Sequence, residues 1–405
     1  MPGLSRRGFL AGCAGAGATG ALASHPAITW TEVLLAADDN GPLPAKTGIL
    51  VLVTMYGGND GLNTVIPYVD NAYQDARPEL AYDDSEVLDL DGQYGLNPGM
   101  VGMADMFDDR SLAIVRGVGY PEPDRSHFRS MDIWQSASLD NSVATGWIGR
   151  WLDANGGDPL HALHFGRTVP QLAVGEGTSA ALFSYDTKRL PGSEELMTRL
   201  AKHHKSDTRA MTMVCDSLRD AAQINRMLTP MFAEGGPLAA SPKSESKGLS
   251  AQLSAVAACI AADVPTQIYS VSIGGFDTHA DERGAQERLL KNLDTAVTDF
   301  MKRMSSDKRA KDIVVMAYSE FGRRVTANAS EGTDHGTAGP VFIIGEQVRG
   351  GFYGDDPSLT DLVDGDLKVT TDFRDVYHEI LTHVLAADPE PIIGKGRKEL
   401  GMLKA

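Results

Sequence analysis

Four short segments combine glycine with acidic side chains or histidine, the residue types that bind metal ions. One acid in a Gly-rich turn is usually only a turn former. Carboxylate and imidazole groups drawn from several segments, however, describe a site for Zn²⁺ or Mn²⁺, with Ca²⁺ or Mg²⁺ as alternatives. The number of groups suits two ions better than one. The candidate ligands are Asp60 in 57–61, Asp277 and His279 in 274–279, Glu320 in 318–323, and Asp334 and His335 in 332–336.

A fifth segment, DRSHFRSMDIWQSA at 124–137, supplies a candidate nucleophile. Ser126 precedes a predicted helix, where serine is most often a simple N-cap. The same position directs backbone N–H groups at an anion, and Arg125 or Arg129 can add donors for a phosphate or sulfate group. His127 fits either a ligand or a base, and spacing does not separate these roles. We therefore expect Ser126 as a metal-activated nucleophile, with an activated water as the alternative.

The elements that must position these groups follow an alternation of strands and helices. Apolar runs rich in β-branched residues predict buried strands, and an apolar stripe at helical spacing predicts a helix over 283–304. Ligands of a parallel sheet bind beyond the carboxyl ends of its strands. Three metal-binding segments follow predicted strands, whereas 332–336 precedes one. The predicted strands are 49–55, 112–115, 268–273, 313–317 and 341–344.

Composition indicates an ordinary globular protein, and the alternation of strands and helices predicts an α/β fold with a largely parallel sheet sandwiched by helices. The chain has 405 residues, of which 42% are apolar and 22% charged, and we expect one domain over 46–405. The Pro/Gly/Ser-rich segment 229–248 predicts a surface excursion. The net charge of −17 is spread along the chain, which argues against nucleic acid as a partner. No segment predicts a stable membrane span.

The N-terminus predicts export. Arg6 and Arg7 belong to a twin-arginine signal, so we expect residues 1–37 to be signal and linker, with cleavage near residue 23. The twin-arginine translocase would deliver the protein to the periplasm, cell envelope or exterior. Cys13 also resembles a lipoprotein site, but too few residues separate it from the arginines for an apolar region. The mature chain keeps Cys215 and Cys259, which we expect to be buried thiols.

Several motifs resemble a known family. They identify the chain as similar to the exported bacterial family called domain of unknown function 1501, from about residue 48 to the C-terminus. That family in turn resembles a distant branch of the alkaline phosphatase and sulfatase superfamily, which implies an alkaline phosphatase-like fold. The motifs are GGNDGLNTVIPY, YGLNPGM, GVGYPEPDRSHFRSMDIWQS, GGFDTHADE, SEFGRR and TDHGTAGPVFIIG.

The resemblance also implies roles for single residues. Glu320 falls where the superfamily has an Asp-His pair, and Phe321 replaces the histidine, which is the largest departure. The Cys-x-Pro-Ser-Arg signature is absent from the sequence, which disfavours a formylglycine sulfatase. The implied roles are a metal-binding acid for Asp60, the nucleophile for Ser126, an Asp/His pair for Asp277 and His279, and a final histidine for His335, supported by Asp334.

We therefore expect an exported metal-dependent hydrolase of phosphate or sulfate esters, either small or polymer-linked. The alternative is a non-catalytic structural or assembly protein on a hydrolase-derived scaffold. Phe321 in place of a histidine favours the scaffold, and the number of potential ligands favours the enzyme.

Overall fold

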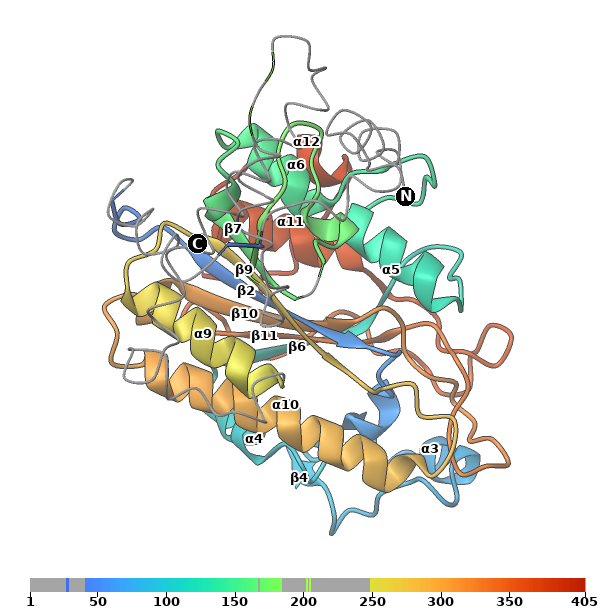
Figure 1. Cartoon of the computed structure of the whole chain (residues 1–405). Helices are drawn as coiled ribbons and strands as arrows, with labels where there is room; N and C mark the ends of the chain where they lie inside the picture. The colour runs from blue at the N-terminus through green and yellow to red at the C-terminus, as the bar shows by residue number, and fades with distance from the viewer. Residues whose placement is uncertain are drawn as a thin grey trace, which may run out of the picture. The chain divides into compact units, whose positions relative to one another are not determined.

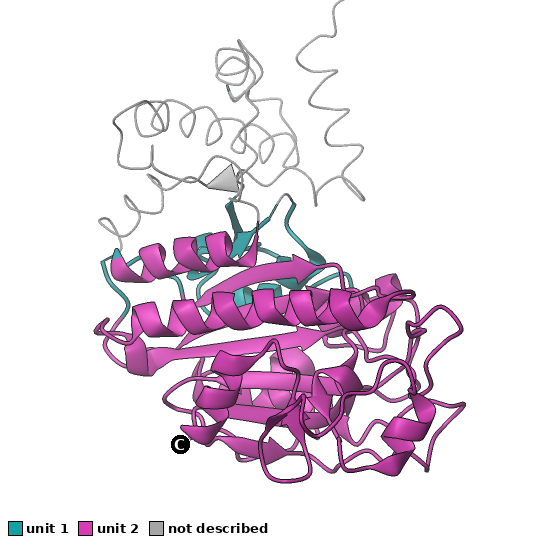
Figure 2. Cartoon of the chain, turned by 90° about the horizontal axis from the view of Figure 1, so that it is seen from below, with its two compact units in different colours: residues 1–43, 144–247, 262–266 teal, residues 44–143, 248–261, 267–405 magenta. Residues whose placement is uncertain are grey.

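The computed structural model describes residues 41–166, 168–183, 202, 204 and 248–404, together with the backbone of a short strand at 27–28. The predicted export signal, Cys215 and residues 229–247 of the predicted excursion lie outside this part of the chain. The chain forms two compact units, coloured separately in Figure 2, and both include residues of the range 46–405. The first unit comprises 1–43, 144–247 and 262–266, and the second comprises 44–143, 248–261 and 267–405. Every candidate site residue belongs to the second unit.

A mixed sheet forms the centre of the second unit, with strand order β9-β2-β10-β11-β6-β12 and β13 also paired with β6. β2, β9 and β10 are parallel to one another. β11 is antiparallel to both of its neighbours, β10 and β6, and is the exception in the largely parallel sheet that the sequence predicted. The bounds are β2 Ile49–Tyr56, β6 Leu112–Gly119, β9 Ile268–Gly274, β10 Ile313–Ser319, β11 Gly339–Ile344, β12 Gly351–Tyr353 and β13 Thr371–Asp372.

Burial explains why these runs form central strands. All residues of β10 and all but the last of β2 are buried, as expected for strands covered on both faces. Ile49 pairs with Ile313 and Met55 with Ser319, so the two strands end side by side. The loops that follow them therefore begin at the same edge of the sheet.

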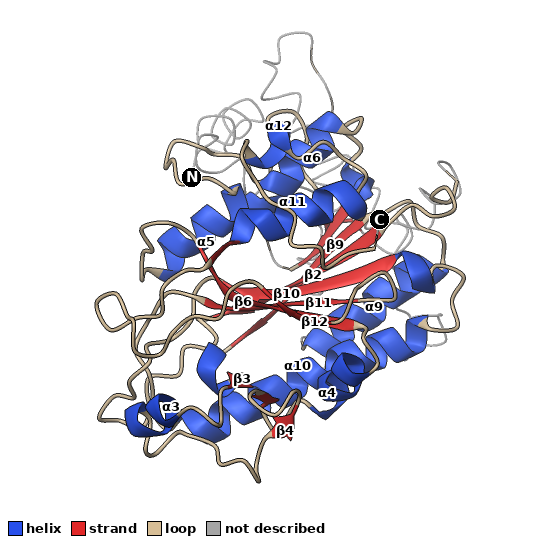
Figure 3. Ribbon diagram, turned by 180° about the vertical axis from the view of Figure 1, so that it is seen from behind, coloured by secondary structure: helices blue, strands red, loops and turns tan. Residues whose placement is uncertain are grey.

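Helices cover both faces of this sheet, which confirms the predicted α/β class (Figures 1 and 3). The predicted helix 283–304 is α10, Glu282–Met304, and Leu290, Leu293 and Val297 of its apolar stripe are buried. α10 lies with α4 and α9 on one face, and α5 and α11 lie on the other. The other helix bounds are α3 Asn71–Ala76, α4 Val101–Asp108, α5 His127–Ser136, α9 Leu249–Ala261, α11 Phe373–His383 and α12 Glu390–Ile393.

Smaller elements complete both units. The second unit adds a sheet of order β3-β5-β4 and two 3-10 turns, Gly61–Asn63 and Ala310–Asp312. Cys259 is a buried free thiol, as predicted, and no helix within the described residues is long and apolar enough to cross a membrane. The small strands are β3 Val65–Ile66, β4 Leu88–Asp89 and β5 Gly95–Leu96, and the first unit contains β1 Ala27–Ile28, β7 Ala162–Phe165, β8 Ala181–Phe183, α6 Trp147–Ala154 and the 3-10 turns Pro159–His161 and Gln171–Ala173.

Candidate metal centre

The direction of β11 explains how a segment before a strand joins segments that follow strands. β2, β9 and β10 run parallel, so the loops after them lie at one edge. Because β11 is antiparallel to β10, its start lies at that same edge, together with the preceding loop 332–338. β6 leads out of the sheet toward α5, whose first residue is His127. Four loops and one helix start therefore meet beyond the carboxyl ends of the parallel strands.

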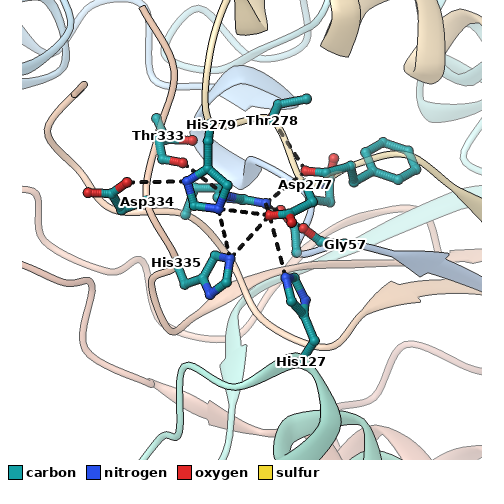
Figure 4. A network of polar contacts seen from close by, with 12 residues as sticks. Gly57, His127, Asp277, Thr278, His279, Thr333, Asp334 and His335 are labelled. Atoms are coloured by element: carbon teal, nitrogen blue, oxygen red, sulfur yellow. Dashed lines mark hydrogen bonds and ion pairs between the residues drawn. The ribbon is translucent and has the colours of Figure 1, made fainter. Parts of the chain in front are cut away.

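Three histidines surround the carboxylate of Asp277 in this cluster (Figure 4). Asp277 Oδ1 lies 3.0 Å from His279 Nε2 and 3.1 Å from His335 Nε2. The two histidine Nε2 atoms are themselves 3.0 Å apart. His127 Nε2 lies 3.4 Å from the same oxygen of Asp277. Imidazole nitrogens and a carboxylate oxygen at such spacing are the donor atoms that a transition-metal ion takes.

Each of the three imidazole rings is held at its other nitrogen by an oxygen atom. His127 Nδ1 lies 2.8 Å from Glu320 Oε1, and His335 Nδ1 lies 2.8 Å from the carbonyl oxygen of Arg125. His279 Nδ1 lies 3.2 Å from Asp334 Oδ1. An oxygen acceptor at Nδ1 favours the tautomer that carries its proton there, which leaves the Nε2 lone pair free. All three lone pairs are thus available at the Asp277 side of the cluster.

One nitrogen of the cluster makes no hydrogen bond within the described part of the chain, although it lies 3.4 Å from Asp277 Oδ1. His127 Nε2 is buried and makes no hydrogen bond with any residue that the structure describes. A buried polar atom without a partner is costly. Together with Asp277 and His335, His127 offers ligand atoms that all lie within 4.8 Å of one another. A cation bound by these atoms would satisfy the lone pair of His127, so the residues present fit a metal ion.

Asp277 is ionised in this setting. Burial alone would raise the pKa of the Asp277 carboxyl, but the hydrogen bond from Arg323, together with the charge of Arg323, lowers that pKa to about 2. Arg323 Nη2 lies 2.7 Å from Asp277 Oδ1. The carboxylate therefore keeps the negative charge that a cation requires at all ordinary pH values.

Glu320 and Asp334, both predicted as ligands, lie behind the histidines instead. Glu320 is buried, and its Oε1 accepts hydrogen bonds from Gly57 N and the His127 ring, while its Oε2 accepts one from Ser319. Asp334 contacts His279 rather than His335, which it was expected to support. Their oxygens hold histidine rings, which is the contact that carboxylates behind metal-binding histidines make in other proteins.

Asp60 has a different role from the one predicted. Its carboxylate is fully buried, and both oxygens accept hydrogen bonds from the guanidinium of Arg77, at 2.5 and 3.0 Å. The same carboxylate caps the 3-10 turn that follows, through Leu62 N. Because both of its oxygens are fully buried and already accept hydrogen bonds from Arg77, Asp60 has no oxygen free for a metal ion. The ion pair with Arg77 also outweighs the effect of burial and lowers the pKa of Asp60.

Ser126 lies between two residues that touch the cluster. Its neighbour Arg125 provides the carbonyl that holds His335, and its other neighbour is His127. Ser126 is the N-cap of α5, as expected, but its Oγ accepts only a long bond of 3.5 Å from Arg129 N. The Arg125 guanidinium, predicted as an anion donor, is paired with the buried Asp366.

Comparison with known proteins supplies the family. A family described as Protein of unknown function (DUF1501) matches residues 118–397. The chain belongs to the DUF1501 family. The family expected from the motifs is thus confirmed, and comparison with curated proteins found no match.

Solved structures similar to this DUF1501 chain share little sequence with it. A protein in the alkaline phosphatase superfamily from Vibrio parahaemolyticus is 11% identical, covering 91% of this chain and 78% of its own, with a TM-score of 0.40. The C-terminal periplasmic domain of EptC from Escherichia coli, in complex with Zn, is 10% identical, covering 88% and 92%, with a TM-score of 0.41. The alkaline phosphatase from the Antarctic bacterium TAB5 is 10% identical, covering 84% and 98%, with a TM-score of 0.39.

Two glycines, one in the GGNDGLNTVIPY motif and one directly before the TDHGTAGPVFIIG motif, allow the loops to approach closely. Gly57 has a φ of +121°, and a Cβ built there would lie 2.5 Å from the backbone nitrogen of Asp277. A Cβ on Gly332 would lie 2.3 Å from the carbonyl carbon of His279. Both positions require glycine because the backbones that carry two of the cluster residues pass directly against them.

Sequence reasoning missed two arginines and the role of Phe321. Arg77 and Arg323 are both fully buried, and charge alone predicts an arginine at the surface. Arg323 belongs to the SEFGRR motif, which follows a predicted strand. This position was the one feature of the sequence that could have marked Arg323 as part of the site. The ring of Phe321 lies 4.9 Å from that of His127 and 5.0 Å from that of His335. Phe321 thus packs against two histidines of the cluster.

A buried acid beside Asp60 predicts a pH-dependent stability. Burial, reinforced by the charge of Asp60, raises the pKa of Glu282 from its ordinary 4.5 to about 9. The folded chain then holds one more proton than the unfolded chain between these values. The stability that this bound proton contributes to the folded chain is complete below pH 4.5 and is lost as the pH rises through 9. We expect Glu282→Gln to gain stability over the parent protein by up to about 1.4 kcal/mol per pH unit in this window.

Chemical unfolding of Glu282→Gln and the parent at pH 5.5, 7 and 8.5 measures this difference. Glu287→Gln on the same helix is the control, because Glu287 is only partly buried. A stability difference that stays constant across the three pH values would contradict the proton held by Glu282.

Proposed function

We propose that this DUF1501 protein is an exported hydrolase of phosphate or sulfate esters that depends on a divalent metal ion. The observation that carries the proposal is the convergence of three imidazole Nε2 atoms on one oxygen of Asp277. Each ring is fixed from behind by an oxygen acceptor, the arrangement by which proteins orient metal-binding histidines. Export by the twin-arginine pathway, to the periplasm, cell envelope or exterior, remains part of this proposal.

The proposed ligands are His127, Asp277, His279 and His335. Two donor atoms of a tetrahedral zinc ion are about 3.3 Å apart when each lies about 2.0 Å from the metal. The measured separations of 3.0 to 3.4 Å between Asp277 Oδ1 and the histidine nitrogens are close to that value. Three nitrogen donors favour Zn²⁺ over Mn²⁺, Ca²⁺ and Mg²⁺, which prefer oxygen.

We propose one ion rather than the two expected from the sequence. The second ion would need Asp60, Glu320 or Asp334 as ligands. Asp60 is neutralised by Arg77, and the other two carboxylates hold histidine rings. The oxygens that would bind a second ion are therefore already engaged.

A divalent ion held by these four ligands would expand to five-coordinate to take an ester oxygen, act on it as a Lewis acid and stabilise the negative charge that develops in the reaction. Ser126 is our candidate for the nucleophile, because the backbone carbonyl of Arg125 on one side of it and the side chain of His127 on the other both contact the cluster. Its position at the start of α5 also directs free N–H groups toward an anionic ester. Glu320 keeps the His127 proton on Nδ1, so His127 Nε2 offers a lone pair rather than a proton.

Ser126→Ala tests the nucleophile. We expect the rate of aryl phosphate or aryl sulfate hydrolysis by the metal-loaded protein to fall by at least about 10³-fold, as when other nucleophiles are removed. We expect stability to fall by no more than about 1 kcal/mol, because the cap bond to Arg129 N is long. Steady-state kinetics with both esters and chemical unfolding give the two quantities.

Ser138→Ala is the matched control, since Ser138 lies just beyond the other end of α5 and also bonds a backbone N–H, that of Asp140. Unchanged turnover in Ser126→Ala would exclude a serine nucleophile and favour an activated water. A protein that binds the metal but hydrolyses neither ester would favour the non-catalytic alternative.

A further inference from the structure

Arg323 connects the loops that carry the candidate ligands. It directly follows the SEFG segment after β10 and is fully buried. Nε donates to the carbonyl of Gly58 at 2.7 Å, and Nη1 donates to the carbonyl of Thr333 at 2.9 Å. Nη2 donates to the carbonyls of Gly57 and Phe276. One guanidinium thus binds the loop after β2, the loop after β9 and the loop before β11.

The same side chain also contacts a ligand directly. Arg323 Nη2 donates to Asp277 Oδ1, the oxygen on which the three histidine nitrogens converge. The backbone of Arg323 forms a bridge with that of His335. Its contacts at Thr333 and Phe276 lie two and one residues before His335 and Asp277. Every loop ligand of the cluster is therefore placed within three residues of a bond to Arg323.

We propose that Arg323 is the positioning residue that assembles the metal centre before the ion arrives. Its planar guanidinium presents five N–H groups in a fixed fork, so it sets the spacing of three loops at once. A lysine at this position keeps the charge but has one compact donor group, and it cannot bridge the three loops. The effect of Arg323 on metal binding rests on the proposed metal centre. Its effect on the placement of the histidine rings applies to the metal-free protein as well.

Arg323→Lys tests the proposal, with Arg309→Lys as the matched control. Arg309 is also buried, and it also donates to two carbonyls, those of Pro44 and Thr47. It precedes β10, whereas Arg323 follows it. Both substitutions therefore remove the same kind of bonds from opposite ends of one strand, and a general loss of stability affects both.

The first measurement is the affinity of each protein for Co²⁺ alone, followed by the visible absorption of the bound ion, which reports its coordination geometry. We expect Arg323→Lys to bind Co²⁺ about 10- to 100-fold more weakly than the parent, with an altered spectrum. Arg309→Lys should keep both the affinity and the spectrum. Equal affinity and equal spectra in the parent and Arg323→Lys would overturn the proposal.

The second measurement needs no metal. In the metal-free parent, the Nδ1 proton of His335 is bonded to the carbonyl of Arg125, so we expect a slowly exchanging histidine ring N–H signal by ¹⁵N NMR. Arg323→Lys should lose this signal and Arg309→Lys should keep it; retention in both would overturn the proposal. A parent protein that binds no Co²⁺ would overturn the metal-dependent function, while the ring signals would still decide the role of Arg323.

If Arg323→Lys does not fold, Arg323→Ala folded in millimolar guanidinium chloride replaces it. We expect guanidinium, but not ammonium, to restore the His335 ring signal, because only the planar fork reaches all three loops. Failure of guanidinium to restore the fold or the signal would also count against a positioning role.

Discussion

His335→Ala should lower the affinity of the protein for Zn²⁺ by more than about 100-fold, because substitution of an outer partner alone costs about 10- to 100-fold. His335 Nε2 is central to the cluster, at 3.0 Å from His279 Nε2 and 3.1 Å from Asp277 Oδ1. Its removal takes away one proposed ligand and leaves a gap between two others. Titration of the metal-free protein with Zn²⁺, followed by mass spectrometry of the bound metal, measures the loss.

His383→Ala is the control for this experiment. His383 Nε2 lies 3.2 Å from Glu399 Oε1, so it is a histidine paired with a carboxylate outside the cluster. We expect this variant to bind Zn²⁺ as the parent does. Equal binding by His335→Ala and the parent would refute the proposed ligand set, and equal losses in both variants would show that the metal binds elsewhere.

Asp60→Asn should produce the opposite combination, a large loss of stability with little change in metal binding. The Asp60–Arg77 pair is fully buried on both sides, and removal of one partner leaves the other charge buried and unpaired. Breaking such a pair costs about 3–5 kcal/mol. Chemical unfolding at pH 7 measures this cost, and the metal content of the folded fraction measures the ligand role.

A surface pair provides the comparison for Asp60. Lys368 and Asp361 form an ion pair with both side chains substantially exposed, and such pairs contribute about 0–1 kcal/mol. Asp361→Asn should therefore change stability little. If Asp60→Asn is folded and stable but binds no metal, the ligand role implied by the family resemblance is restored and our assignment of Asp60 to the ion pair is wrong.

The fold was predictable from the sequence because burial controls its main elements. β-branched apolar runs form β2, β6, β9, β10 and β11, and each observed strand includes its predicted run. The stripe of α10 likewise lies on the buried side of the helix. These patterns are local consequences of removing apolar side chains from water. The direction of β11 was not predictable, because a short buried run carries no sign of the strand beside it.

The sequence predicted most of the residues of the candidate site, but it did not predict which of them contact one another. Asp277, His279 and His335 follow or precede strands in Gly-rich segments, and these features made them visible in the sequence. His127 remained open between ligand and base, and its Nε2 atom, which makes no hydrogen bond with the residues that the structure describes, now favours a ligand. Glu320 and Asp334 have the residue type of ligands, yet their carboxylates hold the rings of other residues.

The sequence by itself determined which acidic and histidine side chains lie at the ends of the strands. It also determined the family through its motifs. Only the tertiary structure decided which of these groups face one another. The antiparallel β11 brings His335 to Asp277, and Arg77 removes Asp60 from the set of available carboxylates. The physical reason is that a charged side chain takes its role from its nearest partner. Arg77 lies 17 positions from Asp60, and Arg323 lies 46 positions from Asp277, so folding alone makes these pairs.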